Sequence, residues 1–287
     1  MAARVLSLAL LASGLPSTLA WGALGHEAVA YVATNFVAST TKSYFQTLLG
    51  DTSTDYLASV ASWADSWRST TAGKFSAPFH YIDANDSPPS SCSVSLSRDC
   101  GSGGCVVSAI SNYTTRLLTS SLSKSERQIA AKMVIHLLGD IGQPLHCEAL
   151  DVGGNDIDVT YDGDSTNLHA VWDSNIAESI AGGSSLSSAK SWAATLTTAI
   201  KTGTYKSAAA GWVSGLSITS AQSSALTWAS ESNAEVCSTV LAKGLSYVEK
   251  NDLSGAYTTT ATPVVNLQIA KQGYRLAKWL DAIAAAA

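Results

Sequence analysis

Most of the chain consists of segments that are rich in alanine and leucine and lack the strict alternation of apolar and polar positions typical of strands. Segments of this kind and length favour helices over strands. We expect helices at 21–35, 55–68, 105–119, 125–138, 187–202, 220–249 with a break, and 264–285.

The helix predicted at 125–138 has the clearest boundaries. Ser123 and Glu126 form a capping-box pattern before its apolar run. Gly139, Gly142 and Pro144 follow the run and favour its end, because glycine and proline are poor continuations of a helix. We therefore expect a stop at Gly139.

Other segments are less helical. The stretch 151–164 contains Val-Thr-Tyr-Asp-Gly and predicts a small β-hairpin. The Gly-, Ser- and Pro-rich stretches 86–104 and 182–188 predict loops, but neither separates two parts that look self-sufficient. The pattern as a whole predicts one all-α domain with a small hairpin and long loops.

The N-terminus has the features of a secretory signal peptide. Arg4 precedes an apolar run, and a small-x-small pattern ends at Ala20. We expect residues 1–20 to be removed and the domain to span 21–287; the alternative is a buried N-terminal helix. No later segment approaches the roughly 18 apolar residues that a membrane span needs. We therefore expect a secreted, extracellular protein without a membrane association.

The composition narrows the protein class. The chain has 287 residues, of which 46% are hydrophobic and 14% charged, so it can bury a core and is not intrinsically disordered. Without Arg4, 16 basic residues face 22 acidic ones, a net charge of about −6. A basic surface therefore cannot be what attracts a polyanion.

Five cysteines suit an oxidising compartment. Four of them can pair, in three ways, and one must remain free. Asn85 and Asn112 begin glycosylation sequons, the first weakened by the proline at position 88.

The five histidines carry the candidate chemistry. Two of them begin a His-x-x-x-Asp pattern, as His136 with Asp140 and His169 with Asp173. Positions i and i+4 share one helix face, so each pair can converge on a metal ion. A single such pair is more typical of a histidine that is merely solvated or capped. Two pairs, together with His146 and with Asp65 and His80 in an aromatic-rich segment, favour a metal site.

Zinc fits this ligand set. Imidazole suits zinc better than calcium or magnesium, which prefer oxygen ligands. The cysteine spacings match no structural zinc site, and the His and Asp ligands are too many for one tetrahedral ion. The set therefore predicts a polynuclear hydrolytic site.

Six separated motifs resemble the zinc-dependent S1/P1 nuclease family, particularly its fungal secreted members. They are Trp-Gly-Ala-Leu-Gly-His at 21–26, Ser-Trp-Ala-Asp at 62–65, Phe-His-Tyr-Ile-Asp at 79–83, His-Leu-Leu-Gly-Asp at 136–140, Gln-Pro-Leu-His at 143–146, and Asn-Leu-His at 167–169 with Trp-Asp at 172–173. They occur in family order and include every histidine of the chain. The resemblance implies an all-α fold shared with the zinc phospholipases C, and a cleft with three zinc ions.

The resemblance also implies the zinc ligands. One zinc is expected on Asp65, His80, His136 and Asp140, and a second on Asp140, His26 and the α-amino nitrogen and carbonyl oxygen of Trp21. The third is expected on His146, His169 and Asp173. A hydroxide that bridges the paired ions would attack phosphorus, and the third ion would stabilise the departing oxygen.

Further roles follow from the same resemblance. Arg68 is expected near the scissile phosphate, as a catalytic residue together with Asp65. Tyr81 is expected to stack on a base, and Asp83 and Asn175 to bind base edges. An ordinary surface arginine and a tyrosine in core packing are the alternatives for Arg68 and Tyr81.

The resemblance pairs Cys92 with Cys237 and Cys100 with Cys105, which leaves Cys147 as the free thiol. We expect a buried, inert thiol; the alternative is an adventitious metal ligand. Cys147 follows a ligand at a position where fungal relatives carry aspartate.

We therefore expect an endonuclease that cleaves single-stranded DNA and RNA to 5′-nucleotides and also acts as a 3′-nucleotidase. We expect a monomer without a protein partner. The alternatives are a phospholipase C-like lipid phosphodiesterase and a zinc-binding protein without turnover.

Overall fold

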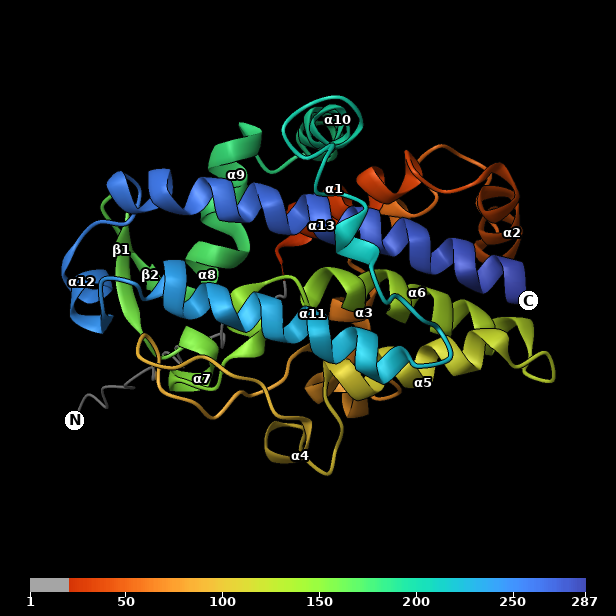
Figure 1. The fold of residues 1–287 in the computed structure, drawn as a ribbon, viewed down its shortest axis with the longest axis horizontal. Helices are drawn as coiled ribbons and strands as arrows, with labels where there is room; N and C mark the ends of the chain where they lie inside the picture. Colours follow the sequence, from red (N-terminus) through yellow and green to blue (C-terminus); the bar gives the residue numbers. More distant parts are fainter. Residues whose placement is uncertain (1–20) are drawn as a thin grey trace, which may run out of the picture.

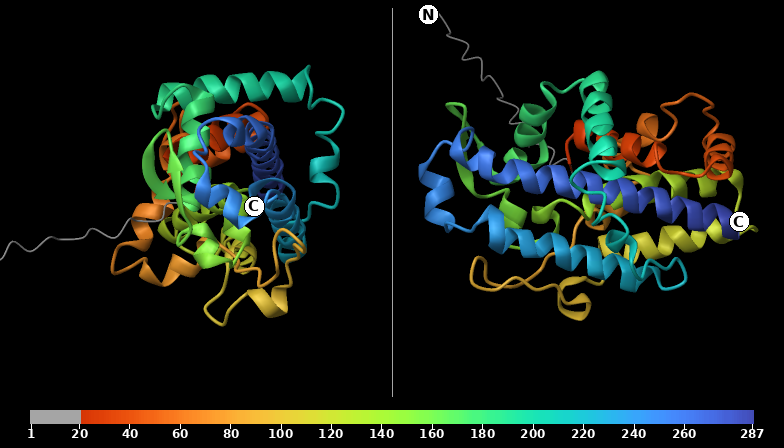
Figure 2. Two further views of the ribbon diagram at one scale, coloured as in Figure 1. Left: turned by 90° about the vertical axis from the view of Figure 1, so that its left-hand side faces the viewer. Right: turned by 45° about the horizontal axis from the view of Figure 1, so that its top comes forward.

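The computed structural model describes residues 21–287, so the expected signal peptide lies outside the described residues. The long helix α13 (Ala256–Ala286) runs along the molecule, with α11 (Ala221–Glu235) beneath it (Figure 1). Helix α1 (Ala23–Thr34) packs against α13 and against α10 (Leu186–Lys201). Figure 2 shows α10 as an outer layer over this bundle. No helix of the described part is long and apolar enough to cross a membrane.

Helix α6 (Lys124–Asp140) lies at the centre of the bundle. It packs against α5 (Val106–Leu118), α13 and α1, and every residue from Met133 to Asp140 is buried. The expected capping box is present, because Ser123 Oγ accepts from Glu126 N and the Glu126 carboxylate accepts from Ser123 N. Because the C-terminal half of α6 is buried, two polar ligand candidates, His136 and Asp140, lie in the protein interior.

Short elements connect and cover the long helices. They are α2 (Ser39–Leu49), η1 (Ala58–Val60), α3 (Trp63–Arg68), η2 (Lys74–His80), α4 (Leu96–Asp99), η3 (Pro144–Cys147), α7 (Asp151–Gly154), α8 (Leu168–Ala170), η4 (Val171–Asn175), α9 (Ile176–Ala181), η5 (Gly211–Val213), η6 (Val236–Val240) and α12 (Leu245–Lys250). Strands β1 (Asp158–Tyr161) and β2 (Asp164–Asn167) form an antiparallel hairpin in which Asp158 pairs with Asn167.

The predicted fold class is confirmed: the chain is mainly helical with one small hairpin. Helices α1, α5 and α10 begin and end within two residues of the expected positions. The expected break within 220–249 lies at 241–244, between the π-helical turn η6 and α12. The sequence pattern missed α2 and α9. It also placed the hairpin too early, because residues 151–154 form a separate turn in which Val152 and Gly153 have positive φ.

The predicted stop at Gly139 is wrong, because α6 continues to Asp140. A Cβ atom at Gly139 would lie 2.7 Å from His26 Nδ1. Glycine is required there for the close approach of α6 to His26, and it does not end the helix.

Two other helix boundaries differ from the prediction. The helix expected at 55–68 is divided into η1 and α3, because the carbonyl of Ala61 faces His136 Nδ1 at 2.7 Å instead of continuing a helical ladder. Helix α13 begins eight residues before the expected position and contains Pro263. Pro263 is exposed, so the backbone carbonyl that it leaves unpaired in the helix can face water.

Two disulfides fix the long loop at 86–104. Cys92 is bonded to Cys237 and Cys100 to Cys105, as the family resemblance implies. Cys147 is buried and unpaired, and burial raises the pKa of its thiol. Its Sγ lies 3.8 Å from the carbonyl of Ile141. A buried thiol in this environment is unreactive.

A buried hydrogen-bond network holds the turn that follows α6. Gln268 Nε2 donates to the carbonyl of Gly142 at 2.8 Å and to Ser232 Oγ at 2.9 Å. Ser232 Oγ in turn donates to the carbonyl of Ile141 at 2.7 Å. Because Gln268 and Ser232 lie on α13 and α11, the network ties the chain between Asp140 and His146 to both long helices.

We predict that Gln268→Met lowers the free energy of unfolding by about 1–3 kcal/mol, because it leaves a buried carbonyl without its donor. Urea denaturation measures the loss. Gln222→Met is the matched control: Gln222 is exposed on α11, and its replacement should cost less than about 0.5 kcal/mol. Equal stability of the two variants would show that the network does not hold the turn.

Candidate metal centre and substrate pocket

Three groups of histidine and aspartate side chains meet in the interior. They are His80, His136 and Asp140; His26, Asp65 and His136; and His146, His169 and Asp173. All of these residues are buried, and within each group the candidate ligand atoms lie within 4.8 Å of one another. The two His-x-x-x-Asp pairs therefore converge as their helical spacing predicts.

Asp140 joins the first two groups. Its Oδ2 lies 3.0 Å from His80 Nδ1 and 3.1 Å from His136 Nε2. Its Oδ1 faces the other way and lies 3.1 Å from His26 Nε2. Asp65 Oδ1 lies 3.6 Å from His136 Nε2 and completes the first set. The two oxygens of one carboxylate thus face two different sets of ligand atoms.

The third group is separate. His169 Nε2 lies 3.1 Å from Asp173 Oδ2 and 3.2 Å from His146 Nε2. Gln143 Nε2 donates to the other oxygen of Asp173 at 2.7 Å and fixes this carboxylate. The π-helical turn η4 carries Asp173, while His169 lies in the preceding turn α8.

Backbone carbonyls set the orientation of three histidine rings. The Nδ1–H groups of His136, His146 and His169 donate to the carbonyls of Ala61, His80 and Gly153, at 2.7, 2.8 and 2.6 Å. These bonds leave the Nε2 lone pairs free to face the centre of each group. Such an outer partner is typical of a metal-ligating histidine, because it fixes both ring orientation and tautomer.

Charge and burial also fit a metal site. Burial lowers the pKa values of His26 and His80, and it lowers the pKa of His146 to about 4, so these rings are neutral donors at neutral pH. Burial also lowers the pKa of His136, but the charges of Asp140 and Asp65 outweigh burial and raise it to about 9. The first group therefore stabilises positive charge at this position.

The donor set passes a direct test of fit. His26 Nε2, His80 Nε2, Asp65 Oδ1 and Asp140 Oδ1 are buried without a hydrogen-bond partner. Unpaired buried polar atoms are rare and costly, so a cluster of them needs a ligand. Imidazole nitrogens with carboxylate oxygens, and no thiolate, fit zinc ions with open coordination positions.

A fourth group, of two acidic residues and a cysteine, is not a candidate metal site. Asp86 and Glu148 lie near Cys92, but Cys92 is bonded to Cys237 and offers no thiolate. Burial raises the pKa of Glu148, as does the neighbouring Asp86. The Glu148 carboxylate also accepts hydrogen bonds from the backbone N–H groups of Ala149 and Leu150. These contacts give it a structural role.

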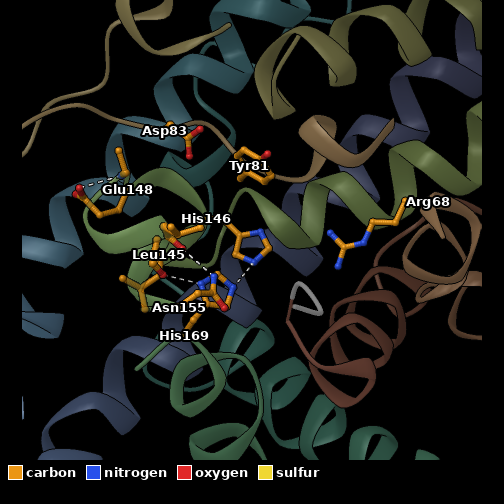
Figure 3. A pocket seen from close by; sticks show the side chains of 11 residues that line it. Arg68, Tyr81, Asp83, Leu145, His146, Glu148, Asn155 and His169 are labelled. Carbon is orange, nitrogen blue, oxygen red and sulfur yellow. Dashed lines mark hydrogen bonds between the residues drawn. The ribbon is translucent and has the colours of Figure 1, made fainter. Parts of the chain in front are cut away.

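A pocket of about 400 Å³ opens beside the third group. His146 and His169 form part of its wall, and Arg68, Tyr81 and Asp83 line it as well. Figure 3 shows the guanidinium of Arg68 directed toward His146 from the right, while Tyr81 and Asp83 lie along the upper side of the view. Its volume is in the range of small-molecule sites.

The structure does not bring Asn175 into this pocket. Asn175 lies in η4 and is absent from the lining residues, whereas Asn155 is among them and lies beside His169 (Figure 3). Because the sequence analysis interpreted 151–164 as a hairpin, it did not identify Asn155 as a candidate site residue. Of the residues expected to bind base edges, Asp83 alone lines the pocket.

Val152 is a further pocket residue that the sequence analysis missed. Its side chain is 64% exposed, and its φ of 58° is uncommon for a β-branched residue. Strained backbone of this kind occurs mainly at functional sites. The sequence feature that could have indicated an irregular turn here is the Val-Gly-Gly-Asn stretch at 152–155, which lies between two histidine motifs.

The expected glycosylation sites are accessible. Asn85 and Asn112 are both exposed, Asn85 in the disulfide-bonded loop and Asn112 on α5.

Comparisons with known proteins agree with this geometry. The S1/P1 Nuclease family matches residues 21–285. The chain is 54% identical to Nuclease S1 of Aspergillus oryzae over 267 residues, which cover 93% of each protein. It is 48% identical to Nuclease P1 of Penicillium citrinum over 263 residues, or 92% of this chain and 97% of the relative. Endonuclease 2 of Arabidopsis thaliana is 38% identical over 57% of this chain. The chain therefore belongs to the S1/P1 nuclease family.

Proposed function

We propose that this nuclease is a secreted zinc enzyme that cleaves single-stranded DNA and RNA to 5′-nucleotides and removes the 3′-phosphate of nucleotides. The observation that carries the proposal is the position of the pocket. One cavity with an exposed aromatic ring, a carboxylate and an arginine opens directly onto buried metal-ligand candidates. Such a pocket can hold a nucleotide with its phosphate at the metal centre.

Three zinc ions account for the buried donors. Asp65, His80, His136 and Asp140 would hold the first, and His146, His169 and Asp173 the third. Asp140 Oδ1 and His26 supply only two donors for the second, and we propose that the α-amino nitrogen and carbonyl oxygen of Trp21 complete it. When bound, zinc ions lower the pKa of water and neutralise phosphate charge.

Arg68 is proposed to bind the phosphoryl oxygens. Its Nη2 lies 3.4 Å from Asp65 Oδ1, and the side chain is only 14% exposed, so the guanidinium is held at the boundary between metal centre and pocket. A fork of donors held in this way would stabilise the negative charge on the phosphoryl oxygens in the transition state. Asp65 positions both this guanidinium and the metal.

The remaining pocket residues are proposed to bind the base. Tyr81 offers a 37%-exposed ring for stacking, and the exposed apolar side chain of Val152 offers a second surface. Asp83 and Asn155 present polar atoms for base edges. Partial desolvation and the charge of the neighbouring Asp99 raise the pKa of Asp83 above its usual value.

Preference for single strands follows from the pocket. A base must leave its stack to enter, and in a duplex this costs a few kcal/mol more than in a flexible strand. The negative net charge of about −6 is offset locally by the +6 of three zinc ions, so positive potential is concentrated at the cleft. Binding is therefore local and tolerant of sequence.

Secretion is proposed from the sequence and the cysteines. Removal of residues 1–20 would free the amine of Trp21, and the two disulfides need an oxidising compartment. Glycans at Asn85 and Asn112 are compatible with the exposure of both side chains. We propose a monomer that acts on single-stranded nucleic acids and 3′-nucleotides without a protein partner.

The experiment that tests this function is a digest of single-stranded DNA, RNA and duplex DNA. We predict products with 5′-phosphates, rates at least tenfold higher on single strands, loss of activity with a chelator and recovery with zinc. Products ending in 3′-phosphate, or equal rates on single and double strands, would contradict the proposal. Release of diacylglycerol from phosphatidylcholine vesicles without DNA cleavage would favour a phospholipase.

A second prediction concerns the bridging carboxylate. Asp140→Asn should lose at least one zinc per chain and nearly all activity, because an amide cannot replace the charge shared by two ions. Elemental analysis and the single-strand assay measure both effects. Asp164→Asn, at an exposed position of the hairpin, is the control and should retain metal and rate. Full zinc content in Asp140→Asn would remove this residue from the site.

The third prediction tests the role of Trp21. A protein with two extra residues before Trp21 should bind one zinc fewer and cleave at least a hundredfold more slowly, because its terminal amine is displaced from the second site. The same two residues added after Ala287, which is exposed, should have no effect. If the N-terminally extended protein keeps full metal content and rate, the amine is not a ligand.

A further inference from the structure

A row of four aromatic side chains lies beside the metal centre. Trp63 stacks on Trp67 with ring centroids 5.0 Å apart and an interplanar angle of 21°. Phe75 meets Trp67 edge-on at 5.5 Å, and Phe79 meets Phe75 edge-on at 5.9 Å. We call these four residues the aromatic row.

The aromatic row is open to solvent. Phe75 is 57% exposed, and Trp63, Trp67 and Phe79 are partly exposed. Only four large hydrophobic side chains in residues 21–287 are exposed to a comparable extent, and two of these, Tyr81 and Val152, line the substrate pocket. An exposed ring that its neighbours hold in place presents a ready surface for another planar group.

The aromatic row is built on the same elements as the catalytic site. Helix α3 carries Trp63 and Trp67 together with Asp65 and Arg68. The helical turn η2 carries Phe75 and Phe79 and ends at His80. The row is therefore rigidly connected to the metal centre through both segments.

A second, smaller cavity adjoins the substrate pocket near the Phe79 end of the row. It has a volume of about 130 Å³ and is lined by Pro78 and by Tyr81 and Asp83, which also line the larger pocket. Gly104, on the opposite wall, faces the ring of Phe79: a Cβ atom at this glycine would lie 2.9 Å from that ring. Because Tyr81 directly follows η2, the segment that carries Phe75 and Phe79 ends at the rim of the substrate pocket.

The charges along the row suit a polyanion. The Lys132 ammonium lies 4.7 Å above the ring of Trp63, and Lys74, next to Phe75, is exposed. Asp65 lies between Trp63 and Trp67 on α3 but is buried, whereas Asp83, beside Tyr81, is exposed. Asp99, its acidic neighbour, is bonded to Arg98 and to the N–H groups of Ser95 and Asn85. Bases can stack on the rings while phosphates face the lysines.

We propose that the aromatic row is a second stacking site for single-stranded nucleic acid, which holds a base outside the nucleotide pocket with Phe75 as its principal contact. This proposal rests on the proposed function and adds a determinant of substrate length. Stacking on an aromatic ring is tolerant of sequence and unavailable to a paired duplex base. The row therefore favours long single strands over mononucleotides.

The test compares three substitutions of Phe75 in the zinc-loaded protein. Binding of a fluorescent 12-nucleotide single strand with phosphorothioate linkages is measured by anisotropy, and cleavage of a 3′-mononucleotide is measured separately. Phe75→Ala and Phe75→Leu should weaken binding of the 12-mer about fivefold or more, the lower end of the effect of one stacked base. Phe75→Tyr should bind as the wild type does. All three should cleave the mononucleotide at the wild-type rate.

The leucine and tyrosine variants separate stacking from packing. Leucine preserves apolar contact with Trp67 and Phe79 but removes the aromatic face, so a purely structural role would leave it close to the wild type in binding. Leu186→Ala removes another exposed apolar side chain on α10 and should change neither measurement. Thermal denaturation should give similar midpoints for all variants.

Two results would overturn the proposal: unchanged 12-mer affinity in Phe75→Ala, or an equal loss of 12-mer binding and mononucleotide cleavage in that variant. Failure of the proposed function is a distinct result, because a wild-type protein without nuclease activity would show it before any variant is compared. The binding measurement still tests the aromatic row in that case.

Discussion

The constraint on which the rest of the structure depends is the convergence of buried histidine and aspartate side chains around the Asp140 carboxylate. One oxygen of Asp140 faces His80 and His136, and the other faces His26, all in the protein interior. Lone pairs that converge without donors destabilise a folded protein unless positive charge lies between them. The histidine and aspartate cluster can therefore hold metal ions, and ions bound there would also stabilise the fold, as is usual where metal binding is coupled to folding.

The surrounding fold serves this requirement. Gly139 allows α6 to approach His26, and the Ala61 carbonyl interrupts a helix in order to orient His136. Gln268 on α13 and Ser232 on α11 hold the turn after Asp140 against these two helices. Each irregular feature near the site therefore contacts either a candidate metal ligand or the turn between Asp140 and His146. This is the pattern expected where function overrides local preference.

The sequence predicted the helical class and the convergence of the histidine pairs, because helical spacing and ligand chemistry are local properties. It could not predict where the chain departs from local preference. From the sequence alone, Gly139 has the properties of a helix stop; the structure shows that glycine is needed there because His26 lies beside it. The sequence around Val152 and Asn155 has the pattern of a hairpin. In the structure, a left-handed turn at 152–153 brings both residues to the pocket wall. Asn175 matched a family position by motif, yet it lies outside the pocket lining. Contacts between distant segments decide these cases.

The central proposal is that the buried groups hold three zinc ions, with Asp140 as a ligand of two of them. The most direct measurement is the anomalous difference density of crystals grown with zinc, recorded above and below the zinc absorption edge. We predict three peaks: one among His80, His136 and Asp140, one between Asp140 and His26, and one among His146, His169 and Asp173. Density on only one side of the Asp140 carboxylate, or no peak at the third group, would contradict the account.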